Sequence, residues 1–364
     1  MIPIARYPLP LHRRLLYSAL VAFAALGALQ AAAVVWEYAP YGARADSGGP
    51  LGLYRPHDPS RPSRPQLQPG VSLRGLLYSI HINSLGFRGP ELLDPKPPAG
   101  LRLWCVGGST TFDIYAPDDA STWPARLGAR LQESLPERTV EVVNAGIPGE
   151  LMEGSLEDFN AFYDRVRPDV LVIYSGPNDL RRLVGAQHPS QPVPMKKPGS
   201  GPNLALVRVV GRLLSNVRRL EAPHGGSPIL PEVIGLKDGL EALIGAAQGR
   251  GSRVLLATHA LQVSQHPSPE ECARRLRKTA LILGLPPATA AATFDAWNDL
   301  VRETAVRHGL ALADVRAAVP PDGSSWGDDS HFAKAGSELA AQTMAAAFLA
   351  HRLQEPGEFR PTAP

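Results

Sequence analysis

The sequence contains little cysteine, the residue that cross-links a chain through disulfides and holds many structural zinc ions. Its 364 residues include only two cysteines, Cys105 and Cys272. Neither cysteine lies in a CxxC pair or in another spacing typical of metal ligands, so the sequence predicts no metal site. Cys105 falls within an apolar run typical of a central strand, where a small buried thiol is common, and we expect no disulfide between the two cysteines.

The sequence also lacks the strong positive charge and the glycine-rich motifs that indicate nucleic-acid or nucleotide ligands. The net charge is only +3, which is too small by itself to indicate a nucleic-acid partner. The glycine-rich turn before Ser109 has neither the lysine of a GxxxxGK[ST] motif nor the spacing of GxGxxG. It therefore does not match these two nucleotide-binding motifs. Taken alone, the turn is also compatible with a phosphate-binding helix N-terminus.

A third absence is local, because residues 180–220 contain no Asp or Glu. The segment carries eight basic residues, namely Arg181, Arg182, Lys196, Lys197, Arg208, Arg212, Arg218 and Arg219. Its first half has the composition of a loop, and apolar residues at helical spacing predict a basic amphipathic helix over Asn203–Leu220. This basic insertion, 181–220, either packs on the domain with a solvated charged face or attracts anionic substrates or an anionic membrane.

Near the N-terminus lies a long run without charge, Leu15–Trp36, which fits a membrane-spanning helix. Arginines in the basic segment 1–14 precede it, so the positive-inside rule places the N-terminus in the cytoplasm and the rest of the chain outside. The sequence thus predicts a single-pass protein of a bacterial inner membrane, facing the periplasm or cell exterior. The alternative is a signal peptide cleaved near Ala31–Ala33, but the run is long for one.

Proline is abundant, at 37 residues or about twice the usual share, and much of it lies in 39–98 and 186–202. We expect 37–98 to form a linker and an extended arm. Strand-like runs lie at about 101–106, 139–143, 169–174, 253–258 and 309–314, and helical patterns lie near 121–135, 154–166, 231–249, 288–308 and 333–352. This alternation predicts a three-layer α/β/α fold with a five-stranded parallel sheet over 99–353, followed by a tail, 354–364.

Four motifs of small and polar residues follow apolar, strand-like runs. They are Gly-Gly-Ser-Thr at 107–110, Asn-Ala-Gly-Ile-Pro-Gly at 144–149, Ser-Gly-Pro-Asn-Asp at 175–179 and Asp-Asp-Ser-His at 328–331. Loops after the strand C-termini of an open parallel sheet share one edge, so we expect the four motifs to converge. Together they supply a serine, a histidine, carboxylates, an amide and close-approach glycines, which is the inventory of a serine hydrolase.

Within these motifs, the spacing suggests individual roles. Ser109 is the candidate nucleophile, exposed by the sharp turn that its two preceding glycines permit. Asp328 lies three residues before His331, so its carboxylate can reach the imidazole and orient it as a base. Asp329 is a rival orienter, but adjacent side chains tend to point apart. We expect Asp329 to favour the N-terminus of the last helix instead.

Three further residues are expected at the same edge. The side-chain amide of Asn178 and the backbone N–H of Gly149 can both point at a developing oxyanion. Each has a simpler alternative, which is turn chemistry for Asn178 and a left-handed backbone for Gly149. His259 follows the fourth strand, and we interpret it as lining the pocket rather than as catalytic.

In order and spacing, the four motifs resemble blocks I, II, III and V of the SGNH (GDSL-like) hydrolases, over roughly 100–350. The resemblance implies a flavodoxin-like fold, Ser109 as nucleophile, and His331 as base with Asp328 as its partner. It also implies an oxyanion hole from the Ser109 and Gly149 backbone N–H groups and the Asn178 amide. Other positions look familial as well: Trp123-Pro124, Asn298, Gly336 and Asn-Ser-Leu-Gly-Phe-Arg-Gly-Pro-Glu at 83–91. Gly108 stands where block I has aspartate, which sets this chain apart from the GDSL lipases proper.

The resemblance implies hydrolysis of esters through an acyl-enzyme, a mechanism that needs no cofactor. The expected substrate is a carbohydrate or lipid ester. An anionic ester would be attracted by the positive charge of the basic insertion. The same residues would also serve an acyltransferase that moves an acyl group onto a glycan. A non-catalytic binding module is a third hypothesis, against which the intact Ser109, Asn178, Asp328 and His331 argue.

Overall fold

The computed structural model describes residues 10–38, 66–74, 78–187, 206–207, 210 and 233–355. Several predicted segments lie wholly or largely outside these residues. They are the start of the basic segment 1–14, the first part of the linker, most of the basic insertion with the helix predicted over Asn203–Leu220, and nearly all of the tail 354–364.

The domain is built on a five-stranded sheet in the order β4–β3–β5–β6–β7, and every neighbouring pair is parallel. The strands are β3 (Gly100–Gly107), β4 (Thr139–Gly146), β5 (Val170–Ile173), β6 (Arg253–Ala257) and β7 (Ala311–Ala313). The predicted five-stranded parallel sheet is therefore confirmed. All of β3 is buried, as expected for a parallel strand covered on both faces.

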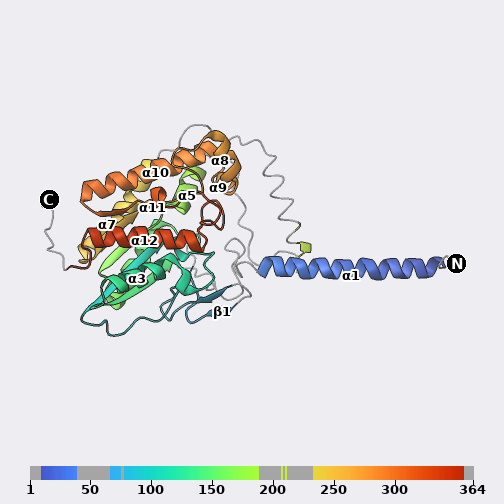
Figure 1. Ribbon diagram of the computed structural model, residues 1–364, viewed down its shortest axis with the longest axis horizontal. Helices are drawn as coiled ribbons and strands as arrows, with labels where there is room; N and C mark the ends of the chain where they lie inside the picture. Colours follow the sequence, from blue (N-terminus) through green and yellow to red (C-terminus); the bar gives the residue numbers. More distant parts are fainter. Residues whose placement is uncertain are drawn as a thin grey trace, which may run out of the picture.

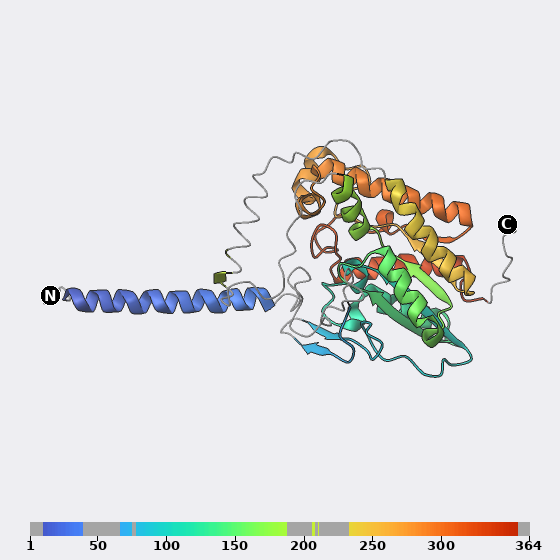
Figure 2. The same cartoon turned by 180° about the vertical axis from the view of Figure 1, so that it is seen from behind.

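Helices cover both faces of this sheet. One face carries α3 (Trp123–Ser134) and α12 (Lys334–Ala350), which Figure 1 shows in front of the strands. The other face carries α4 (Met152–Val166), α7 (Lys237–Gly249) and α10 (Pro287–His308), with α4 and α7 toward the viewer in Figure 2. The result is the three-layer α/β/α architecture that the alternating pattern predicts.

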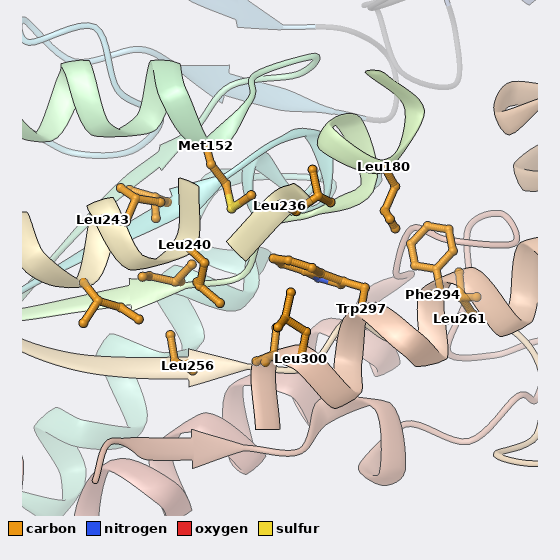
Figure 3. Packing of buried hydrophobic residues seen from close by; sticks show 14 of the residues in the cluster. Met152, Leu180, Leu236, Leu240, Leu243, Leu256, Leu261, Phe294, Trp297 and Leu300 are labelled. Carbon is orange, nitrogen blue, oxygen red and sulfur yellow. The ribbon is translucent and has the colours of Figure 1, made fainter. Parts of the chain in front are cut away.

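The hydrophobic core is split by the sheet into two clusters, and β3 contributes to both because its side chains alternate. Trp104 and Val106 belong to the cluster under α4, α7 and α10, whereas Leu103 and Cys105 belong to the one under α3 and α12. Figure 3 shows part of the first cluster, with Trp297 among leucines of several elements. Both cysteines are buried and free, and Cys105 lies in a buried strand, as predicted.

Several local predictions are wrong. The loop expected from Leu180 onward begins inside a helix, α5 (Pro177–Gln187), because the turn after β5 leads directly into helical residues. The last strand is shorter than 309–314, because Gly309 adopts a left-handed conformation (φ 62°) that caps α10. Three short helices are not predicted from the sequence: α8 (Pro269–Arg275), α9 (Arg277–Leu283) and α11 (Val315–Ala318). A further short helix, α2 (Ser109–Phe112), begins at the turn after β3. The start of the helix expected over 231–249 is a 3-10 turn, η3 (Val233–Leu236).

The arm before the sheet contains a small antiparallel hairpin of β1 (Ser72–Arg74) and β2 (Ser79–His81). Further along the arm, Arg88 is buried and joins it to the domain. The guanidinium of Arg88 donates to the carbonyls of Phe112, Asp113 and Ala116, and to the carboxylate of Asp119 in η2 (Asp119–Ser121). The arm is thus fastened to the turn that follows α2.

The N-terminal helix, α1 (Leu11–Tyr38), projects away from the domain (Figure 1). Its stretch Leu11–Val35 is long and apolar enough to cross a membrane, as a signal sequence also can be. Its large apolar side chains are exposed, so α1 is not a helix of the domain's core. A hydrogen bond joins the described part of the basic insertion to α1, where the backbone N–H of Leu206 donates to Gln30 Oε1 at 2.9 Å.

Candidate active site

The candidate nucleophile lies at the C-terminal end of β3. Gly107 has φ 150°, and a Cβ there would lie 2.2 Å from the carbonyl oxygen of Tyr174. A Cβ on Gly108 would lie 2.4 Å from the amide nitrogen of Asn178. Only glycines allow so close an approach of the neighbouring loop. The chain then turns into α2, and Ser109 is the first residue of that helix.

The serine and the histidine are brought together from opposite ends of the domain. Ser109 Oγ lies 2.8 Å from His331 Nε2, across 222 residues of sequence. On its other side, His331 Nδ1 lies 2.9 Å from Asp328 Oδ1 and 3.0 Å from Oδ2. The three side chains therefore form a continuous hydrogen-bonded chain, with the histidine nitrogens assigned as a triad requires.

The carboxylate of Asp328 is held in its charged form. Burial alone would raise the pKa of Asp328, but the charge and hydrogen bond of His331, together with Lys278, lower it far below its usual range. Asp328 Oδ1 also accepts the backbone N–H of His331 at 2.8 Å, which fixes the loop around the pair. An ionised carboxylate at this position can stabilise an imidazolium.

Asp329 points away from His331. Its carboxylate accepts the backbone N–H of Thr279 at 2.8 Å and the Thr279 hydroxyl at 2.9 Å. The expectation that Asp329 favours the N-terminus of the last helix is wrong, because its partner is α9 and not α12. Asp328 and Asp329 do face opposite directions on this loop: Asp328 faces His331, and Asp329 faces α9.

Asn178 and Gly149 lie at the same edge of the sheet. Asn178 Nδ2 donates to the carbonyl oxygen of Glu150 at 2.9 Å, which leaves one of its two N–H groups for another acceptor. Gly149 has φ 88°, with open space where a side chain would be. Within the described part of the chain, the backbone N–H groups of Ser109 and Gly149 donate no hydrogen bond. Three donors are thus available beside the nucleophile.

His259 lies after β6 as expected, but its side chain is completely buried and does not line an open pocket. Its ring stacks on Tyr174 at 5.0 Å and packs against Phe294 at 5.2 Å. Burial, with the charges of His331 and Arg316, lowers the pKa of His259 to about 3, so the ring is neutral. Asn298 brackets its backbone, accepting from the N–H at 2.6 Å and donating to the C=O at 2.9 Å.

Two side chains that the sequence reading missed complete the surroundings of Asp328. Tyr115 donates its hydroxyl to Asp328 Oδ2 at 3.0 Å, and its ring lies edge-on to His331. Lys278, on α9, forms an ion pair with the same oxygen. Neither residue lies in a motif, and both come from elements distant in sequence, so no local pattern could indicate them.

Ser109 begins α2, and Asp113 follows the end of this helix. Asp113 is buried and adopts a left-handed conformation (φ 62°). Its carboxylate accepts the Ser337 hydroxyl at 2.7 Å and the Trp123 backbone N–H at 2.8 Å. Trp123 also donates its indole N–H to the carbonyl of Thr110. These bonds join α2 to α3 and α12. They give a structural reason for Trp123, which is one of the family-like positions in the sequence.

Gly336 has a separate structural reason. A Cβ at this position would lie 2.1 Å from the carbonyl oxygen of Ser325, so the loop that carries His331 can pack closely on α12 only over a glycine.

As for metal binding, no group of three or more His, Cys, Asp or Glu residues suited to an ion occurs among the described residues.

The pattern of the GDSL-like Lipase/Acylhydrolase family matches residues 105–339, which is more than half of the chain. The chain belongs to this family. It is accordingly an ester-hydrolysing enzyme of the SGNH/GDSL type, with the fold described above.

Solved structures of this fold are similar over most of the domain, and a comparison with curated proteins finds no match. LAE5, an alpha/beta hydrolase from the metagenome of Lake Arreo, is 21% identical, with 69% of this chain and 94% of that chain covered and a TM-score of 0.41. A putative lipolytic protein of the G-D-S-L family from Desulfitobacterium hafniense is 15% identical, with 68% and 98% covered and a TM-score of 0.41. Axe2, an acetylxylan esterase from Geobacillus stearothermophilus, is 18% identical, with 72% and 97% covered and a TM-score of 0.40.

Proposed function

We propose that this enzyme cleaves carboxylic esters through an acyl-enzyme on Ser109. The observation that carries the proposal is the continuous chain from Ser109 Oγ through His331 to Asp328, with hydrogen-bond distances of 2.8 and 2.9 Å. His331 takes the hydroxyl proton as Ser109 attacks the ester carbonyl, and Asp328 stabilises the imidazolium. The imidazolium then returns the proton to the leaving alcohol, and water releases the acyl group by the same steps.

The developing oxyanion needs donors placed before the reaction starts. The backbone N–H groups of Ser109 and Gly149 and the remaining N–H of Asn178 are suited to this role. Asn178 is held in place by its bond to the carbonyl of Glu150, so it loses little freedom when substrate binds. The site residues of the proposal are therefore Ser109, Asp328 and His331 for chemistry, with Gly149 and Asn178 beside Ser109 for the oxyanion.

The substrate and its location are the finer part of the proposal. We infer a carbohydrate or lipid ester outside the cytoplasm, because the apolar helix α1 precedes the domain and arginines precede the apolar run. On this reading the enzyme is a single-pass protein of a bacterial inner membrane, and the domain 99–353 faces the periplasm or exterior. The eight cations of 181–220 favour an anionic ester or an anionic membrane surface.

A fluorophosphonate probe and an ester panel test the proposal. The wild-type protein should be labelled and should hydrolyse p-nitrophenyl esters, with one chain length preferred. Ser109→Ala should not be labelled and should lose roughly 10³-fold or more of kcat/KM. Ser134→Ala is the matched control, because the Ser134 hydroxyl only bonds a carbonyl of its own helix. Near-normal turnover by Ser109→Ala would refute the nucleophile assignment.

The same panel separates hydrolysis from acyl transfer. Each ester is incubated with and without acceptor sugars, and the products are identified by mass. Free acid as the main product in both cases supports the hydrolase, whereas acylated sugar at the expense of free acid would reassign the enzyme as an acyltransferase.

A further inference from the structure

Both oxygens of the Asp328 carboxylate accept several hydrogen bonds, more than a partner of histidine requires. Oδ1 accepts from His331 Nδ1 and from the backbone N–H groups of His331 and Ser330. Oδ2 accepts from the Tyr115 hydroxyl and from Lys278 Nζ. The triad chemistry uses only the bond to Nδ1, so the lysine is not explained by the proposed function.

The position of Lys278 is built into the fold. The next residue along α9, Thr279, binds the neighbouring carboxylate of Asp329 through both its backbone N–H and its hydroxyl. This pair of bonds fixes the first turn of α9 against the loop that carries His331. Lys278 is therefore directed at Asp328 by a buried contact, unlike a surface lysine that finds a carboxylate by chance.

Burial makes this ion pair stronger than an ordinary surface pair. The Asp328 side chain is only 12% exposed, whereas that of Lys278 is 46% exposed. The lysine side chain is thus reachable by solvent while the aspartate side chain is largely shielded from it. A cation on this oxygen offsets part of the negative charge that faces His331.

We propose that Lys278 is a positioning residue of the triad. It fixes the second oxygen of Asp328, and by partly neutralising this carboxylate it lets His331 stay an unprotonated base at lower pH. The inference rests on the proposed function, in which His331 is the base. Tyr115 holds the same oxygen without a charge, so it serves the geometry alone.

Other titratable and charged groups lie close to His331, and their effects must be separated from that of Lys278. Asp113, Tyr115 and His259 lie on the neighbouring elements, and Asp329 lies on the same loop. Asp113 is the most relevant, because burial raises its pKa to about 6 despite Ser337, Trp123 and Arg88. All of these groups are the same in the wild type and in a Lys278 variant, and an Asp113→Asn background removes the titration of Asp113.

The experiment compares pH profiles of kcat/KM for the full chain and its variants. The acid limb is the part of this profile where kcat/KM rises with pH as His331 loses its proton. Lys278→Met should move this limb to higher pH by about one unit, because the uncompensated carboxylate favours the imidazolium. The value of kcat/KM at pH 6 should therefore fall severalfold. Lys278→Arg should restore most of the profile. Tyr115→Phe should lower kcat while leaving the limb near its original place.

Arg277→Met is the matched control. It removes one positive charge from the adjacent position of the same helix, but among the described residues the Arg277 side chain hydrogen-bonds only to the carbonyl of Ala273. The control should leave the limb in place. An unmoved limb in Lys278→Met, or an equal shift in Arg277→Met, would overturn the proposal, because either result makes Lys278 one of many surface charges.

A second measurement does not depend on turnover. The ring of His331 is titrated by NMR, with its signals assigned by their absence from His331→Gln. The midpoint should rise by about one pH unit in Lys278→Met and stay in place in Arg277→Met. If the wild type hydrolyses no ester, the proposed function fails, while this titration still decides the effect of Lys278 on His331.

Discussion

At the residue scale, the adjacent carboxylates Asp328 and Asp329 do different work because they face opposite directions. Asp328 bonds the imidazole, whereas Asp329 bonds Thr279 on α9. Asp328→Asn should therefore lower kcat/KM on the order of 10³–10⁴-fold, since an amide cannot stabilise the imidazolium. Asp329→Asn should cost less than tenfold in rate and about 1 kcal/mol of stability. Kinetics and urea unfolding of both variants check this, and the reverse ranking of rates would contradict the assignment.

Asp113 gives a pH-dependent prediction. Its folded-state pKa of about 6 lies above the ordinary value of 3.8, chiefly through burial. The folded protein thus binds an extra proton between these values, so the stability contributed by Asp113 is full below pH 4 and is lost as the pH rises toward 6. The loss amounts to roughly 3 kcal/mol for a buried group.

Asp113→Asn should remove this dependence, and asparagine tolerates the left-handed backbone. The difference in unfolding free energy between the variant and the wild type is measured from pH 4 to pH 7. It should shift in favour of the variant by roughly 3 kcal/mol over that range. A difference that stays constant with pH would show that Asp113 is ionised throughout.

The residues near the catalytic serine also show what a sequence can and cannot reveal. The pairing of Asp328 with His331 was predictable, because two residues three positions apart on one loop keep their side chains within reach of each other. Tyr115 and Lys278 were not, because they reach Asp328 across 213 and 50 residues. Their placement depends on how α2 and α9 pack, and no local pattern encodes that packing.

At the scale of elements, the strands and long helices were predictable and the short helices were not. A buried parallel strand such as β3 is a continuous apolar run, and a helix such as α10 shows a repeating apolar pattern over several turns. The short α8 and α9 have one or two turns each, which is too little for a periodic signal. The helix α5 (Pro177–Gln187) was not predictable either, because it begins within the Ser-Gly-Pro-Asn-Asp motif, and Gly-Pro is typical of a turn.

The arm is the element with the clearest testable role. The buried Arg88 serves three carbonyls and Asp119, so no other side chain can replace all of its bonds. Arg88→Ala should lower the unfolding free energy by about 3–5 kcal/mol, because it leaves a carboxylate and several carbonyls without their donor. Activity should fall with it, since Tyr115 lies in the turn that Arg88 holds.

Urea unfolding and kcat/KM are measured on the same Arg88 preparation. Arg74→Ala is the control, because it removes an exposed arginine from the hairpin strand β1. It should cost less than 1 kcal/mol. Equal effects of the two substitutions would mean that the arm does not support the site through Arg88.

At the scale of the whole molecule, α1 is the part that the domain does not explain. Phe23 is 82% exposed and Val21 is 69% exposed, and neighbouring leucines are also exposed. A continuous apolar surface of this kind is unfavourable in water, so we predict that α1 either lies in a membrane or is removed from the mature protein. The two outcomes give proteins of different length and location.

We expect α1 to remain as an anchor, because an apolar run of this length exceeds the h-region of a typical signal peptide. The full chain, expressed in a bacterial host with a C-terminal reporter that works only outside the cytoplasm, should be active and should stay in the membrane fraction after an alkaline wash. Intact mass should include α1, and replacing Ala31 and Ala33 with leucine, which blocks cleavage of a signal peptide, should change nothing. A shortened soluble protein that becomes membrane-bound only in the leucine variant would establish cleavage, and a silent reporter would reverse the orientation.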